Sequence, residues 1–188
     1  MSQIFIIHGA YGDPEENWFP WLKEELEDKG HEVSVPEFPT PENQELEVWK
    51  ERFQPYMEKI GGNTVFVGHS LGPAFILSIL EDLELEEPIR ACFFVSGFVG
   101  KLGIPKFDRI NRSFVDKDFN WERIRKNCKS FYIFHSKDDP YVPLEKAEEL
   151  AKKLDAGLEL IDGAGHFNEE SGYTEFKSLL DKINTTIV

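Results

Sequence analysis

Basic residues are scarce in this sequence. Only 21 lysine and arginine residues stand against 35 aspartate and glutamate residues, and the formal net charge is -14. Such a charge repels phosphate backbones and anionic lipid over long range. We therefore expect neither nucleic acid nor a membrane as a partner, and we interpret the acidic runs as solvated helix faces.

Cysteine and long apolar runs are also nearly absent. Two cysteines, Cys92 and Cys128, are too few for a disulfide framework and are expected to be buried, reduced thiols. No stretch approaches the roughly 18 apolar residues that a membrane-spanning helix needs, and no basic leader precedes the first apolar run. These absences predict a soluble, cytoplasmic protein.

Motifs for metals and phosphate-bearing cofactors are missing. The five histidines show no H-x-x-x-H spacing, and the two cysteines form no C-x-x-C pair. Neither G-x-G-x-x-G nor the Walker pattern occurs. We therefore expect no metal and no cofactor.

What the sequence does contain is an alternation of strand-like and helix-like segments. Six short runs rich in Val, Ile and Phe predict strands buried on both faces, at residues 3–8, 31–35, 63–68, 90–96, 130–135 and 157–161. Segments with apolar residues spaced by three and four predict helices between most of them, at residues 18–30, 45–60, 74–83, 143–154 and 174–183. The length of 188 residues fits one domain, 1–188. We predict a doubly wound α/β domain with a mostly parallel sheet of about six strands and helices on both faces.

One segment, residues 97–120, interrupts this alternation. It is long for a connection that has no function or helix of its own. It carries five basic residues of this acidic chain: Lys101, Lys106, Arg109, Arg112 and Lys117. It could form a pocket wall or a solvated loop, and the sequence favours neither.

The stretch "GHSLG" carries the clearest chemical signal. Gly68, Ser70 and Gly72 form G-x-S-x-G between a predicted strand and a predicted helix, where the turn holds the serine hydroxyl out of the sheet as a nucleophile. The amide of Leu71, at the start of that helix, is expected to face a developing oxyanion. A second donor is expected from the loop after the first strand, "HGAYG", through the amide of Ala10 or Tyr11.

A serine nucleophile needs a base, and the base needs a group that orients it. Asp139 follows the fifth predicted strand and His166 follows the sixth, so both lie at the same edge of the sheet as Ser70. Asp138 is the rival acid, but the pattern D-x-x-V-P favours Asp139. The other histidines that adjoin strands, His8, His69 and His135, are interpreted as structural or pocket-lining. The order Ser, Asp, His is that of α/β hydrolases.

These pieces resemble the YdeN and retinoblastoma-binding protein nine family of small serine hydrolases. The matching stretches cover nearly the whole chain: "IIHG", "NWFPWL", "GHSLG", "VSGF", "WERIRKNC", "SKDDPYVP" and "GAGHF". The resemblance implies an α/β-hydrolase fold without a large cap domain, a triad of Ser70, Asp139 and His166, and a carboxylesterase-type activity. One member of the family binds a protein partner through an L-x-C-x-E segment, which this sequence lacks.

The expected reaction is hydrolysis of a small carboxylic ester through an acyl-enzyme. Residues near the active loops are candidates for the pocket wall: Tyr11, Trp18, His69, Phe98, Tyr141 and Phe167. Two alternatives stay open. The chain could be an interaction module with a vestigial triad, or a thioesterase, amidase or perhydrolase that uses the same residues, because pocket shape and not the triad selects the leaving group.

Overall fold

A single six-stranded sheet organises the computed structural model, which describes residues 1–187. The strands are β1 (Gln3–Ile7), β2 (Glu32–Ser34), β3 (Thr64–His69), β4 (Ala91–Val95), β5 (Phe131–His135) and β6 (Gly157–Leu160). Their order across the sheet is β2-β1-β3-β4-β5-β6, and every neighbouring pair is parallel. The predicted α/β architecture and the six strands are confirmed.

The two edge strands differ from the prediction. The four inner strands are almost entirely buried, but in β2 only Val33 is buried and no residue of β6 is. The expectation that all six strands are buried on both faces was therefore wrong for these two. An edge strand has a neighbour on one side only, and a short apolar run in the sequence does not show where in the sheet it will lie.

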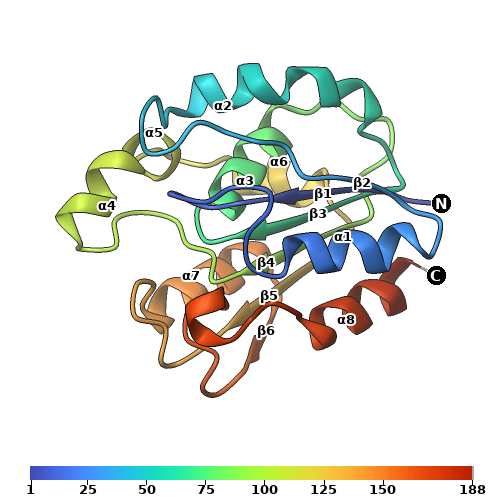
Figure 1. Cartoon of the computed structure of the whole chain (residues 1–188). Coiled ribbons are helices and arrows are strands. Elements are labelled where there is room, and N and C mark those ends of the chain that lie inside the picture. Colours follow the sequence, from blue (N-terminus) through green and yellow to red (C-terminus); the bar gives the residue numbers. More distant parts are fainter. Residues whose placement is uncertain (188) are drawn as a thin grey trace.

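Helices cover both faces of the sheet (Figure 1). On one face lie α1 (Phe19–Glu27) and α8 (Lys177–Ile187), whose buried residues share a core with Ile4, Ile6 and Val67. On the other lie α2 (Leu46–Phe53), α3 (Gly72–Asp82), α6 (Trp121–Lys126) and α7 (Leu144–Leu154), which pack on Phe5, Ile7 and Phe66. Successive strand residues therefore alternate between the two cores, as the two-residue period of a strand requires.

The predicted helix over residues 45–60 is two elements. Helix α2 ends at Phe53, and a 3-10 helix, η1 (Gln54–Lys59), continues the chain. Pro55 lies at the junction, where its missing N–H and its ring prevent a continuous α-helix. The apolar spacing alone did not reveal this change.

The segment 97–120 is partly helical and forms no large cap domain. It contains two short helices, α4 (Pro105–Ile110) and α5 (Arg112–Val115), beside the carboxyl end of the sheet (Figure 1). A further 3-10 turn, η2 (Glu169–Ser171), follows β6. Within residues 1–187, no helix is long and apolar enough to cross a bilayer.

Candidate active site

Ser70 lies at a tight turn between β3 and α3. Its φ is 58°, in the left-handed region that a non-glycine residue seldom adopts, and its N–H donates to the Val95 carbonyl at 2.9 Å. A Cβ at Gly68 would lie 2.8 Å from the Pro73 nitrogen, and a Cβ at Gly9 would lie 2.7 Å from the Ser70 Cβ. Glycine at both positions therefore lets the helix and the first loop approach the serine closely.

Two backbone amides beside Ser70 are available for an oxyanion. Among residues 1–187, the Leu71 and Ala10 amides have no hydrogen-bond partner. The Tyr11 amide, the other candidate from the first loop, donates to Thr40 Oγ1 at 2.6 Å. Of the two candidate amides from the first loop, the one without a partner is therefore that of Ala10, because a side chain 29 residues further along the chain accepts the Tyr11 amide.

Asp139 and His166 meet at the carboxyl edge of the sheet. The His166 Nδ1 lies 2.9 Å from Asp139 Oδ2 and 3.1 Å from Oδ1. The Asp139 side chain is fully buried, and its Oδ1 accepts the amides of Tyr141 and Val142 at 2.9 and 3.0 Å. Burial alone would raise the pKa of Asp139, but the contact with His166 and the two amides outweigh it and hold that pKa below its ordinary value. The carboxylate is thus charged where it faces the imidazole.

Asp138, the rival acid, has different partners. Its Oδ1 contacts the Ser136 hydroxyl and accepts the Gly165 N–H at 3.2 Å. The Ser136 hydroxyl, chiefly, holds the pKa of Asp138 below its ordinary value. The structure therefore brings Asp139 and not Asp138 to His166.

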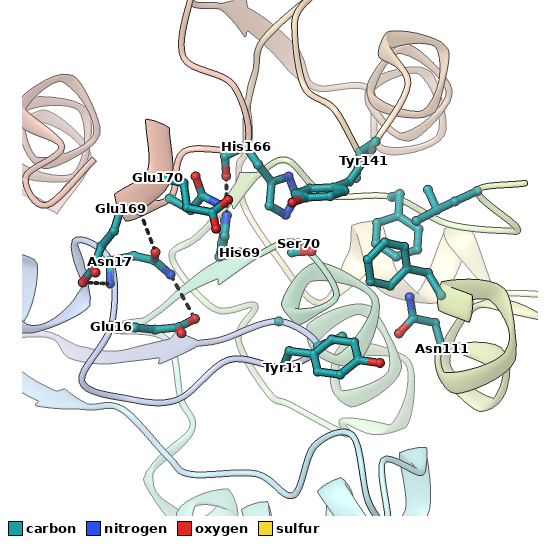
Figure 2. Close-up of a pocket in the computed structure, with 17 residues that line it drawn as sticks. Tyr11, Glu16, Asn17, His69, Ser70, Asn111, Tyr141, His166, Glu169 and Glu170 are labelled. Carbon is teal, nitrogen blue, oxygen red and sulfur yellow. Dashed lines mark hydrogen bonds between the residues drawn. The ribbon is translucent and has the colours of Figure 1, made fainter. Parts of the chain in front are cut away.

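A cavity of about 350 Å³ opens beside Ser70 and His166. Figure 2 shows Ser70 near its middle, with Tyr141 and Asn111 on one side and the carboxylates of Glu16, Glu169 and Glu170 on the other. The ring of Tyr141 meets the His166 ring edge-on, at 5.0 Å between centroids. Among the described residues, no hydrogen bond joins Ser70 to His166, although both side chains line this cavity.

The pocket predictions divide into two groups. Tyr11, His69, Phe98 and Tyr141 line the cavity, as expected. Trp18 and Phe167 do not.

Trp18 and Phe167 are instead fully buried core residues. The Trp18 Nε1–H donates to the Phe167 carbonyl at 3.0 Å, and both rings pack against Phe176, with centroids 5.8 and 5.1 Å away. Their assignment to the pocket wall was wrong. Both residues lie near active loops in the sequence, but nearness along the chain does not fix the direction of a side chain.

The segment 97–120 combines the two interpretations that were left open. Its Phe98, Leu102, Phe107 and Asn111 line the cavity, so it forms a pocket wall. Its basic residues do not line the cavity: Lys117, for example, pairs with Glu81 at 2.6 Å. The wall is therefore formed by three apolar residues and Asn111, while the basic residues other than Lys117 are exposed to solvent.

Sequence reasoning missed the polar end of the cavity. Five residues there were not predicted: Glu16, Asn17, Asn168, Glu169 and Glu170. They come from two segments, the loop before α1 and the segment that follows His166. Hydrogen bonds between Asn17 and Glu169, which are 152 residues apart in the chain, join the two segments. The sequence offered one signal for this polar end, the stretch "NEE" at residues 168–170, which begins two residues after His166.

The buried histidines are held by main-chain groups. The His69 Nε2–H donates to the His166 carbonyl at 2.8 Å, and burial, the chief cause, lowers the pKa of His69 to about 3. His8 contacts the Gly9 carbonyl at 2.8 Å, and His135 the Val142 carbonyl at 3.0 Å. Neutral His69 therefore supports the loop that carries His166.

Within residues 1–187, no three His, Cys, Asp or Glu side chains lie together in an arrangement that could hold a metal ion. Cys92 and Cys128 are both buried and free, with their sulfur atoms 3.7 Å apart.

Comparisons with known proteins agree with this geometry. Residues 4–185 match the family model described as serine hydrolase. The chain is 33% identical to YdeN of Bacillus subtilis (strain 168) over 184 residues, which are 98% of this chain and 95% of YdeN. It is 27% identical to the serine hydrolase RBBP9 of Rattus norvegicus over 176 residues, which are 90% of this chain and 86% of RBBP9.

Solved structures give the same result. The crystal structure of the ydeN gene product from B. subtilis matches with a TM-score of 0.93 at 32% identity, over 99% of this chain and 98% of that chain. Est1E from Butyrivibrio proteoclasticus matches with a TM-score of 0.69 at 18% identity, over 99% of this chain and 88% of that chain, and shares the fold. The family model spans nearly all of the sequence, and on this evidence the chain belongs to the serine hydrolase family.

Proposed function

We propose that the protein hydrolyses small carboxylic esters, with Ser70 as nucleophile, His166 as base and Asp139 as the group that orients the base. The observation that carries this proposal is the 2.9 Å contact between His166 and the buried Asp139, at a cavity that also exposes a serine with φ of 58°. A charged carboxylate behind an imidazole and a serine held on a strained turn are the parts that acyl transfer needs.

In the first half of the reaction, His166 Nε2 takes the proton of Ser70 Oγ while that oxygen attacks the ester carbonyl carbon. The carbonyl oxygen becomes an oxyanion and accepts the Leu71 and Ala10 amides. Its collapse expels the alcohol, which leaves with the proton from His166, and the acyl group remains on Ser70. Loss of one oxyanion donor typically costs about 3 to 4 kcal/mol of transition-state stabilisation.

In the second half, His166 takes a proton from water, and the resulting hydroxide adds to the acyl carbon. Collapse of this second oxyanion releases the carboxylic acid and returns the proton to Ser70. Asp139 keeps its negative charge throughout, in accord with its lowered pKa. Its contact with Nδ1 leaves Nε2 as the nitrogen that faces the serine.

The missing hydrogen bond between Ser70 and His166 is compatible with these roles. In ligand-free enzymes such contacts are often long and shorten only when substrate binds. Both side chains line one cavity, so a small rotation of either changes the distance between them without moving a strand or helix.

The shape of the cavity supports a small substrate. Its volume of about 350 Å³ is near the lower end of the range for ligand pockets, and no large cap domain extends it. The apolar side, with Phe98, Leu102 and Phe107, suits a short acyl group. We expect acetate and butyrate esters to be hydrolysed faster than long-chain esters.

Covalent labelling with a fluorophosphonate tests the nucleophile directly. The wild type should label, Ser70→Ala should not, and the exposed serine of α8 provides the matched control Ser178→Ala, which should label as the wild type does. Removal of a triad nucleophile can lower turnover by about a millionfold. A wild type that never labels would exclude this function and favour an interaction module.

A panel of nitrophenyl esters of increasing chain length, with one thioester and one anilide, then defines the substrate. Fastest turnover of a short ester agrees with the proposal. Fastest turnover of a long-chain ester contradicts the proposed acyl length. Fastest turnover of the thioester or the anilide contradicts the proposed leaving group.

A further inference from the structure

Two loops supply the base and its orienting acid. The acid loop, residues 136–143, follows β5 and carries Asp139, and the histidine loop, residues 161–168, follows β6 and carries His166. Their side chains meet at 2.9 Å. Neither loop is a helix or strand, so something else must hold one against the other.

Ser136 provides one link between the loops. Its side chain is almost fully buried, and its Oγ accepts the Ala164 N–H at 3.2 Å. The Ile161 carbonyl lies 2.7 Å from the same Oγ and can accept its proton, as can the carboxylate of Asp138. A single hydroxyl thus contacts the histidine loop at two points.

Asp138 provides the second link. Its Oδ1 accepts the Gly165 N–H at 3.2 Å, one residue before His166. The lowered pKa of Asp138 keeps the carboxylate a charged acceptor, which strengthens a hydrogen bond, while the exposure of this residue to water weakens it. Gly165 has a φ of 52°, and a Cβ at this position would collide with Ser171 Oγ, so the chain there follows a path that only glycine adopts easily.

We propose that Ser136 and Asp138, which we call the clamp, are positioning residues that set the distance between His166 and Asp139. This inference rests on the proposed function. The clamp residues Ser136 and Asp138 lie three and one positions before Asp139, and their respective partners Ala164 and Gly165 lie two and one positions before His166. Each hydrogen bond of the clamp is therefore nearly adjacent to the contact that it fixes.

The clamp also explains why two neighbouring aspartates occur in "SKDDP". Asp139 contacts the imidazole side chain, and Asp138 contacts the backbone that carries it. A catalytic group that is misplaced by about 1 Å can cost about 100-fold in rate. Loss of the clamp should therefore slow the reaction even though every triad residue is still present.

The test compares four variants by the rate constant of fluorophosphonate labelling. Asp138→Ala and Ser136→Ala remove the clamp and should label about 10- to 100-fold more slowly, with most molecules still labelled at the end point. Asp138→Asn keeps an oxygen acceptor for the Gly165 amide and should recover most of the rate. The control is Asp162→Ala, which removes an exposed carboxylate of the histidine loop. Among residues 1–187 its one ion pair is with Lys137 of the acid loop, at 3.6 Å. Both side chains of this further contact between the loops are exposed, so it contributes little and the variant should stay within about threefold of the wild type.

A second background separates positioning from damage to the fold. In His166→Asn, which lacks the base, adding Asp138→Ala should cause no further loss of rate, because a positioning residue acts through the group that it positions. A loss of labelled fraction without a loss of rate constant would show partial unfolding and overturn the assignment. So would Asp138→Ala that labels as fast as the wild type.

Hydrogen exchange tests the clamp without catalysis. The amides of Ala164 and Gly165 should exchange at least about tenfold faster in Ser136→Ala and Asp138→Ala, respectively, than in the wild type. Unchanged exchange would overturn the clamp whatever the activity. A wild type that fails to label, with the exchange result as expected, would instead exclude the proposed hydrolase function and leave the clamp as a link between the loops.

Discussion

Replacing Asp139 with asparagine is the sharpest test of the proposed triad. The side chains are nearly equal in size, so the fully buried site is not emptied, and the remaining oxygen can still accept the Tyr141 and Val142 amides at its present 2.9 and 3.0 Å. The amide nitrogen then faces His166 Nδ1, now 2.9 Å from Oδ2. Because that nitrogen is a donor, Nδ1 must become the acceptor.

The expected loss follows from this reversal. An imidazole that accepts at Nδ1 carries its proton on Nε2, where it cannot take the proton of Ser70. In serine hydrolases with this triad, the corresponding change lowers kcat by about 10⁴-fold. At about 1.36 kcal/mol for each factor of ten, this is about 5.4 kcal/mol of transition-state stabilisation.

The assay is kcat for a nitrophenyl acetate, together with the rate constant of fluorophosphonate labelling and urea unfolding. Asp162→Asn is the matched control, because it is the same exchange at an exposed position of the histidine loop and should leave kcat within about threefold. A folded Asp139→Asn protein that keeps more than a tenth of the wild-type kcat would refute the assignment of Asp139 as the orienting acid.

Three further predictions concern the core, the cavity charge and pH. Trp18→Ala should lower the free energy of unfolding in urea by about 3 to 5 kcal/mol, because Trp18 is fully buried. KM of the folded enzyme should stay within about threefold, because Trp18 does not line the cavity; a large change in KM would show that Trp18 contacts the substrate. Glu170→Gln should raise kcat/KM several-fold for an ester with an anionic group relative to a neutral ester, since one carboxylate leaves the cavity; an equal change for both would contradict this. Burial lowers the pKa of His69 to about 3 from 6.5, so below pH 6.5 the unfolded chain binds a proton that the folded chain does not. The free energy of unfolding therefore decreases as the pH is lowered from 6.5 to about 3. By pH 5 the loss should reach about 2 kcal/mol in urea unfolding, and His69→Gln should show a smaller loss; an equal loss would exclude His69 as its source.

Local features of the sequence were enough for the fold class and the candidate nucleophile. Strand and helix periods follow from backbone geometry, so apolar spacing shows which segments are which before any tertiary contact is known. The elbow is equally local, since Gly68, Ser70 and Gly72 lie within five residues. Asp139 and His166 each follow a predicted strand, and this predicted that both lie at the same edge of the sheet as Ser70, because parallel strands end on one side of the sheet.

Exposure of strands and the path of a helix depended on more than local spacing. The runs that became β2 and β6 were grouped with the inner strands although each contains a glutamate, Glu32 or Glu159, and their edge positions leave them largely unburied. Pro55 divided a segment whose apolar spacing reads as one helix. The position in the sheet decided the exposure of the two edge strands, and the missing N–H of proline decided where the helix ends.

The sequence by itself determined that a serine stands on a glycine-flanked turn of an α/β sheet, with an acid and a histidine on later loops. Only the tertiary structure decided which groups those loops engage. It brought Asp139 to the imidazole and Asp138 to the Gly165 amide, gave the Tyr11 amide to Thr40, and placed Trp18 in the core. Side-chain direction and long-range hydrogen bonds are set by packing between segments far apart in the chain, and no local pattern records them.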